Sequence, residues 1–125
     1  AEGRFEDMIA YGGWTMDDHH LAAIHWPGPP TIWHPAPSPY GIPYRCLYSA
    51  NIENLFFAGR NISVSHMALS STRVMGTCAL LGQAAGTAAA LAIGSAGEGS
   101  PAVDVRQVDR LALRERLLQD HAILG

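Results

Sequence analysis

Residues 74–93 form a run of twenty residues without a charged side chain, and this run most constrains the fold. The run is long enough to cross a bilayer, and the spacing of Gly82 and Gly86 is one that pairs membrane helices. Alanine and glycine dominate it, however, and Gln83 lies near its middle, so membrane insertion would gain little per residue. We therefore favour a helix over Val74–Ala92 that neighbouring protein buries on all sides.

One face of this helix is unusually slim, because Gly82, Ala85, Gly86 and Ala89 fall at i, i+3, i+4 and i+7. Glycine inside a helix costs about 1 kcal/mol relative to alanine, so we expect this face to pack closely against a strand or a cofactor-bearing domain. Ser71 or Thr72 is the expected N-cap. Gly94 and Gly97 are expected to end the helix and to lead into a flexible Gly/Ser link.

Shorter elements flank this helix. Residues 8–11, 45–48 and 54–58 have strand character, with a turn at 49–53. A last helix is expected over 105–119, with Asp104 and Gln107 at capping-box spacing. Its apolar stripe is predicted to comprise Val105, Val108, Leu111, Ala112 and Leu118.

Residues 27–43 hold seven of the eight prolines. Proline fixes φ and removes a backbone donor, so we expect an extended excursion outside any sheet. A surface loop joining two parts of a substrate domain is favoured over a proline-rich docking ligand.

Composition excludes some classes of function. The net charge of −3 gives no basic footprint for nucleic acid. Cys46 and Cys78 lack metal-ligand spacing and do not make a disulfide framework. No tight two-histidine-plus-carboxylate spacing occurs around Asp17, His19, His20 and His25, so we expect no metal there but a polar pocket or a solvated loop. The N-terminus lacks a basic-then-apolar signal segment, and the expected location is the cytoplasm.

Four blocks of the sequence share one family pattern: Ile42–Tyr48, Asn54–Arg60, Ser71–Cys78 and Gly82–Ala90. Through them the chain resembles the C-terminal part of FAD-dependent oxidoreductases of the glutathione-reductase-like class. The resemblance is weaker over 12–19 and 104–124. It implies an α/β fold class, the C-terminal piece of a glutathione-reductase-like FAD-binding fold with few short strands plus two helices. Residues 1–48 would be a remnant of the substrate or cap domain, and 49–125 the C-terminal part of the FAD-binding domain.

The same resemblance implies FAD as the cofactor and two segments that contact it. The turn Gly59, Arg60 and Asn61 would lie along the ribityl and pyrophosphate part, where a glycine allows close backbone approach. Residues Arg73, Val74, Met75, Gly76 and Thr77 would lie against the N1 and C2-oxygen edge of the ring, where helix amides stabilise negative charge. Two alternatives stay open: a simple strand-to-loop turn at 59–61, and an Arg73 that pairs with a carboxylate elsewhere.

Other residues are candidates for substrate chemistry. His66 is expected on a loop facing the flavin, where it could accept a proton from a substrate hydroxyl or amine; the alternative is a histidine bonded to backbone. Asp17, His19 and Arg45 match family positions and are candidates for the substrate pocket. Cys78 would be stabilised as a thiolate in a first helical turn, although its apolar surroundings favour a buried thiol.

The Gly-x-Gly-x-x-Gly motif that holds the FAD pyrophosphate does not occur in these residues. We therefore expect the chain to be the last quarter of a flavin-dependent oxidoreductase that moves hydride from a small-molecule substrate to flavin. An N-terminal FAD-binding chain or segment would complete it, and homo-oligomers are expected. The alternative function is a non-catalytic assembly or dimerisation module derived from a flavoprotein tail.

Overall fold

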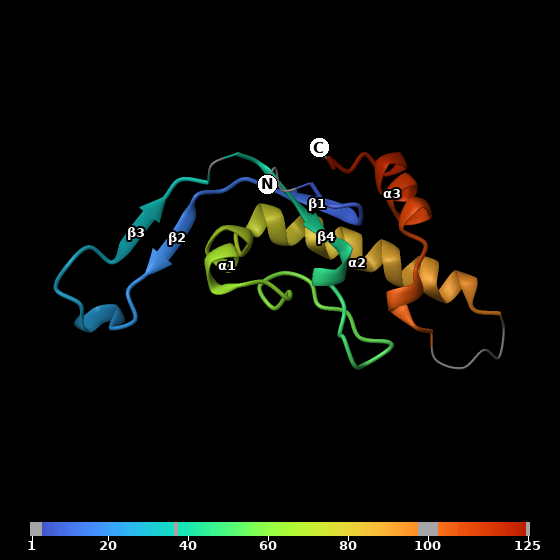
Figure 1. Ribbon diagram of the computed structural model, residues 1–125, viewed down its shortest axis with the longest axis horizontal. Coiled ribbons are helices and arrows are strands. Elements are labelled where there is room, and N and C mark those ends of the chain that lie inside the picture. Colours follow the sequence, from blue (N-terminus) through green and yellow to red (C-terminus); the bar gives the residue numbers. More distant parts are fainter. Residues whose placement is uncertain (1–3, 37, 98–102, 125) are drawn as a thin grey trace.

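The computed structural model describes residues 4–36, 38–97 and 103–124 (Figure 1). It contains four short strands and three α-helices, so the expected α/β class is confirmed with one helix more than expected. The strands are β1 (Met8–Gly12), β2 (Met16–His19), β3 (Thr31–His34) and β4 (Tyr40–Pro43), and the helices are α1 (His66–Thr72), α2 (Met75–Ser95) and α3 (Arg110–Gln119). Short 3₁₀ turns occur at Ala23–His25, Tyr44–Cys46 and Val105–Gln107.

The strands form two antiparallel pairs, β1 with β4 and β2 with β3. The first pair lies over α2, whereas the second projects past α1 as a hairpin (Figure 1). The strand expected over 8–11 is therefore confirmed. The expectation that 27–43 avoids any sheet is wrong, because β3 and β4 both lie within it. Prolines are tolerated there because Pro35 and Pro39 lie between the strands, Pro43 ends β4, and each strand has only one neighbour.

The strands expected over 45–48 and 54–58 are wrong as regular strands. Only one bridge, between Tyr48 and Phe56, joins them, with flanking amide bonds to Leu47 and Leu55 carbonyls of 2.7 and 3.0 Å. The Ser49 hydroxyl accepts the Ile52 amide at 3.1 Å and closes the connecting turn early.

Two helices, rather than a loop and one helix, occupy 66–95. Ser65 caps α1 by accepting the Ala68 amide at 3.3 Å, so His66 begins a helix and does not lie on a loop. Ser71 and Thr72 lie buried in the last turn of α1, and the expectation that either caps α2 is wrong. Their hydroxyls donate instead to the carbonyls of Trp14 at 2.5 Å and Ala68 at 3.1 Å. The N-cap of α2 is Val74.

Helix α2 is buried along one face, which packs against β1 and α3. That face carries Thr77, Leu81, Ala84, Ala85, Ala88 and Ala92. Gly82 and Gly86 are exposed, and a Cβ on either would meet no atom within 4 Å. No described strand or helix therefore packs closely against these glycines, and the described chain buries α2 on one face only; packing against a further, cofactor-bearing domain stays a prediction. The larger Leu81 gains more from burial than a glycine does, and it sets which face turns inward.

The length and composition of α2 would also suit a membrane crossing, and 33% of its apolar 18-residue stretch is buried. One such helix is weak evidence, because core helices of water-soluble proteins pass the same test. The helix runs through Gly94 to Ser95, beyond the predicted end at residue 92, and the expected link at 98–100 lies outside the described residues.

The helix expected over 105–119 is divided by a break at Val108 and Asp109. Asp109 caps α3 by accepting the amides of Leu111 at 2.8 Å and Ala112 at 3.3 Å. The break shifts which residues of the following helix face inward, so the predicted apolar stripe is wrong in part. Val105 and Val108 are buried as expected, but Leu113 and Leu117 replace Leu111 and Leu118, which are 74% and 48% exposed.

Asp104 closes the preceding 3₁₀ turn through the Arg106 amide at 3.0 Å. The predicted capping box is not formed there, because Gln107 donates through Nε2 to the Asp104 carboxylate, whereas a capping box needs the Gln107 side-chain oxygen to accept the Asp104 amide. The charge-assisted hydrogen bond from Arg106 lowers the pKa of Asp104 to about 2.

This lowered pKa predicts an acid-dependent loss of stability. A carboxyl group with a depressed folded-state pKa stabilises the fold above its unfolded pKa of about 3.9, and the contribution is lost as pH falls towards 2. We expect the free energy of unfolding to decrease over this interval less steeply in Asp104→Asn than in the wild type. Urea unfolding between about pH 2 and 5 measures both, and parallel curves would contradict the assignment.

Candidate cofactor and substrate site

The start of α2 is open. Its N-cap, Val74, has no side-chain acceptor, and the first helical hydrogen bond runs from the Cys78 amide to the Val74 carbonyl at 2.9 Å. The amides of Met75, Gly76 and Thr77 precede this bond and have no acceptor within the helix. The N-terminal end of the helix macrodipole therefore presents three donors to whatever lies in front of it.

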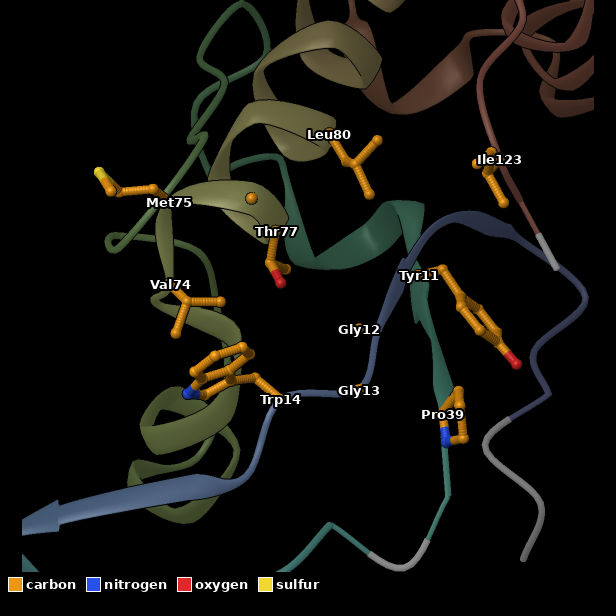
Figure 2. A pocket seen from close by; sticks show the side chains of 11 residues that line it. Tyr11, Gly12, Gly13, Trp14, Pro39, Val74, Met75, Thr77, Leu80 and Ile123 are labelled. Carbon is orange, nitrogen blue, oxygen red and sulfur yellow. The ribbon is translucent and has the colours of Figure 1, made fainter.

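A cavity of about 640 Å³ lies in front of these amides (Figure 2). Figure 2 shows Trp14, Val74 and Thr77 on one side of the opening and Tyr11 and Pro39 on the other. The complete lining is Tyr11, Gly12, Gly13, Trp14, Pro39, Val74, Met75, Gly76, Thr77, Leu80 and Ile123. Its volume lies within the roughly 300–1,000 Å³ of small-molecule and cofactor sites.

The chemistry of this cavity fits a flat, largely apolar ring with an electron-rich edge. Its walls are mostly aromatic and aliphatic, and the start of α2 adds the free backbone amides of Met75, Gly76 and Thr77. A Cβ on Gly76 would meet no atom within 4 Å, so this backbone is accessible to a ligand. Of the predicted cofactor residues, the structure brings Val74, Met75, Gly76 and Thr77 to this cavity.

The corner between α1 and α2 is fixed by contacts to the segment before β2. Tyr40 donates to the Ser71 hydroxyl, and Ser71 donates to the Trp14 carbonyl, each at 2.5 Å. Arg73 donates to the Asp17 carbonyl oxygen at 2.8 Å and to its carboxylate Oδ2 at 3.3 Å. Arg73 thus takes the alternative left open by the sequence, a carboxylate partner.

A polar cavity of about 190 Å³ adjoins the same corner. Its lining is Asp17, Asp18, His19, Arg60, His66, Leu69, Ser70 and Arg73. Arg73 lines this cavity while the next residue, Val74, lines the apolar one, so the two cavities are neighbours along the chain. The structure therefore brings together Asp17, His19 and His66, three of the residues predicted for substrate chemistry.

Asp17 is the most constrained member of the polar cavity. Its Oδ2 accepts from Arg73 and lies 3.1 Å from His19 Nε2, while His19 Nδ1 lies 3.2 Å from the Thr31 hydroxyl. Its other oxygen, Oδ1, is buried without a hydrogen-bond partner. Among the residues described, no group of three or more potential ligands could hold a metal ion.

His66 is the most accessible candidate for proton transfer. Its side chain is 81% exposed, and its Nε2 lies 3.8 Å from Asp18 Oδ1. It also lines a second polar cavity of about 210 Å³ with Met16, Asp18, His34, Met67 and Ser70.

The other predicted residues lie outside these cavities. Arg45 pairs with Asp7 and lies over the Phe5 ring, 5.1 Å from its centroid, and it lines neither cavity. Gly59 has φ of +91°, and a Cβ there would lie 3.7 Å from Cys78 Sγ, so the 59–61 turn adjoins the first turn of α2. Within that turn, Asn61 is exposed and Arg60 reaches the polar cavity.

Sequence reasoning missed three residues that shape the site. Tyr11 and Trp14 wall the apolar cavity, and Asp18 lines both polar ones. Trp14 directly after Gly12-Gly13 was the available signal, because ligand pockets are lined predominantly by hydrophobic and aromatic side chains.

The fold and cavities describe a protein with an uncapped helix start in front of an apolar cavity, beside a small polar one. The model of the FAD dependent oxidoreductase family matches residues 1–117, and the chain belongs to this family. FAD is accordingly its cofactor. No curated protein and no solved structure matches the chain.

Proposed function

We propose that the chain forms the ring side of the FAD site in an oxidoreductase of the glutathione-reductase-like class. The observation that carries this proposal is the uncapped start of α2, whose Met75, Gly76 and Thr77 amides open on the apolar cavity. These donors are fixed by the helix and need no reorganisation when negative charge develops on a bound ring.

Bound FAD would supply a two-electron acceptor for hydride. The residues of the polar cavity would bind and orient the substrate, with Asp17 and His19 held in place through Arg73 and Thr31. His66 would accept the proton that leaves a substrate hydroxyl or amine, since its exposed ring can reach a ligand in either polar cavity. The backbone of Gly59–Asn61 would approach the ribityl chain beside the first turn of α2.

An N-terminal FAD-binding chain or segment would complete the site, because residues 1–125 contain no pyrophosphate-binding fingerprint. We assign residues 1–48 to a remnant of the substrate domain and 49–125 to the FAD-binding domain, in a cytoplasmic enzyme. Contacts between copies would cover the exposed apolar residues and give a homo-oligomer.

The test compares FAD retention by the purified chain alone and with an added N-terminal FAD-binding segment. We expect stoichiometric flavin, seen by its visible absorbance, only in the completed protein, because a ring-side cavity alone lacks the pyrophosphate contacts. Strong retention by the chain alone would contradict the need for a partner. No retention in either form would overturn the proposal.

A non-catalytic assembly module remains the second candidate because of one observation. The outer face of α2 exposes Gly82 and Gly86, and Met75 and Ile93 project into solvent. This reading predicts self-association or partner capture without flavin, so the same purification separates the two functions.

A further inference from the structure

The polar cavity holds one cation without a partner. Four arginines of the described chain, Arg45, Arg73, Arg106 and Arg116, have a carboxylate within 4.0 Å. Arg60 lines the cavity with its side chain exposed, and like Arg4, Arg110 and Arg114 it has no carboxylate of the described residues within that distance. A guanidinium in this position offers paired donors that match a carboxylate.

The same cavity holds acceptors that lack donors. Asp17 Oδ1 is buried without a hydrogen-bond partner, which is unfavourable for a carboxylate oxygen. Asp18 is half exposed, and its only ion-pair neighbour in the described chain is His66 at 3.8 Å, beyond hydrogen-bond distance.

These groups together require a ligand with an anionic end and a donor-rich end. We infer that the polar cavity binds a small α-amino acid, an inference that rests on the proposed function. Its carboxylate pairs with Arg60, and its ammonium group donates to Asp17 and Asp18. An ammonium has three N–H donors and a hydroxyl has one, so only the former can serve both aspartates and still face His66.

The size of the cavity suits the head group of the ligand. A cavity of about 190 Å³ holds the carboxylate, Cα and ammonium group of an α-amino acid, and a longer side chain would extend through its opening into solvent. The assignment also gives Arg60 to the substrate rather than to a cofactor phosphate.

The test is a calorimetric titration with alanine, as both enantiomers, of the chain alone and of the FAD-loaded completed protein. Propionate and ethylamine each lack one end of the amino acid and serve as matched ligands. We expect alanine to bind at least roughly tenfold more tightly than either, and Arg60→Gln to weaken alanine binding by roughly tenfold or more, as for a lost charge-assisted hydrogen bond. Arg110→Gln removes the same charge from α3, away from the cavity, and should leave binding unchanged.

Several outcomes would overturn the inference. They are no alanine binding, equal binding of propionate, or an Arg60→Gln variant that loses FAD affinity and keeps alanine affinity. Asp18→Asn provides a second variant at an exposed position, expected to weaken alanine and not propionate. A protein that retains FAD and ignores alanine refutes this inference alone, whereas failure to hold FAD refutes the proposed function, since the cavity is built from this chain.

Discussion

Replacing Gly76 with leucine is expected to weaken FAD binding roughly 5- to 150-fold, the equivalent of about 1–3 kcal/mol for overfilling a packed site. Gly76 lies in the first turn of α2 and lines the apolar cavity, and a Cβ there meets no protein atom within 4 Å. The added side chain therefore enters the space assigned to the ring. Titration of the completed apoprotein with FAD, followed by flavin fluorescence, measures the effect.

The control for this variant lies in the same helix. Gly94→Leu also places its Cβ where no atom lies within 4 Å, but Gly94 does not line the cavity. Both substitutions should raise helix stability by a similar amount, up to about 0.8 kcal/mol. If Gly76→Leu binds FAD as tightly as Gly94→Leu does, the ring does not occupy this cavity.

Local sequence patterns predicted the helices and strands whose secondary structure follows from their own residues alone. The uncharged run predicted α2 almost to its ends, and the apolar residues 8–11 predicted β1. Helix α1 was missed because it has seven residues with serine and threonine at its end, and such residues favour caps and turns by propensity. Strands β3 and β4 were missed because proline dominates the composition around them, although within the strands only Pro43, opposite Met8 at the end of β4, occupies a paired position.

The segment expected to contact the cofactor could be predicted from the sequence, whereas the residues that surround it could not. The family pattern placed Val74–Thr77 at a helix start, and the structure adds that this start is uncapped and faces a cavity. Nothing local in the sequence indicates that Tyr11 and Trp14 wall that cavity, because they reach it through the pairing of β1 with β4 and the contact of Trp14 with Ser71. Likewise, the tertiary fold decides that Arg73 pairs with Asp17 and that Arg45 pairs with Asp7, because the sequence offers several other carboxylates to each arginine.

Truncation of Tyr44 should produce the largest loss of stability in the chain. This one side chain packs against Tyr48 and Phe56 and also hydrogen-bonds to Val105, in the segment before α3. Its ring is fully buried between Tyr48 and Phe56, with edge-to-face contacts at centroid distances of 5.2 and 6.1 Å. Its hydroxyl donates to the Val105 carbonyl at 2.6 Å, and burial raises the pKa of Tyr44, so the hydroxyl remains protonated and able to donate.

Two substitutions separate these contributions. Tyr44→Ala should lower the free energy of unfolding by about 3–5 kcal/mol, as for large aromatic truncations. Tyr44→Phe keeps the ring but leaves the buried Val105 carbonyl without its donor, and it should cost about 1–3 kcal/mol. Tyr48→Phe is the matched control, because the partly exposed Tyr48 hydroxyl makes no hydrogen bond among the described residues, and its removal should stay within about 0.5 kcal/mol. Urea unfolding measures all three, and equal costs for Tyr44→Phe and Tyr48→Phe would show that the bond to Val105 does not hold residues 103–108 against the core.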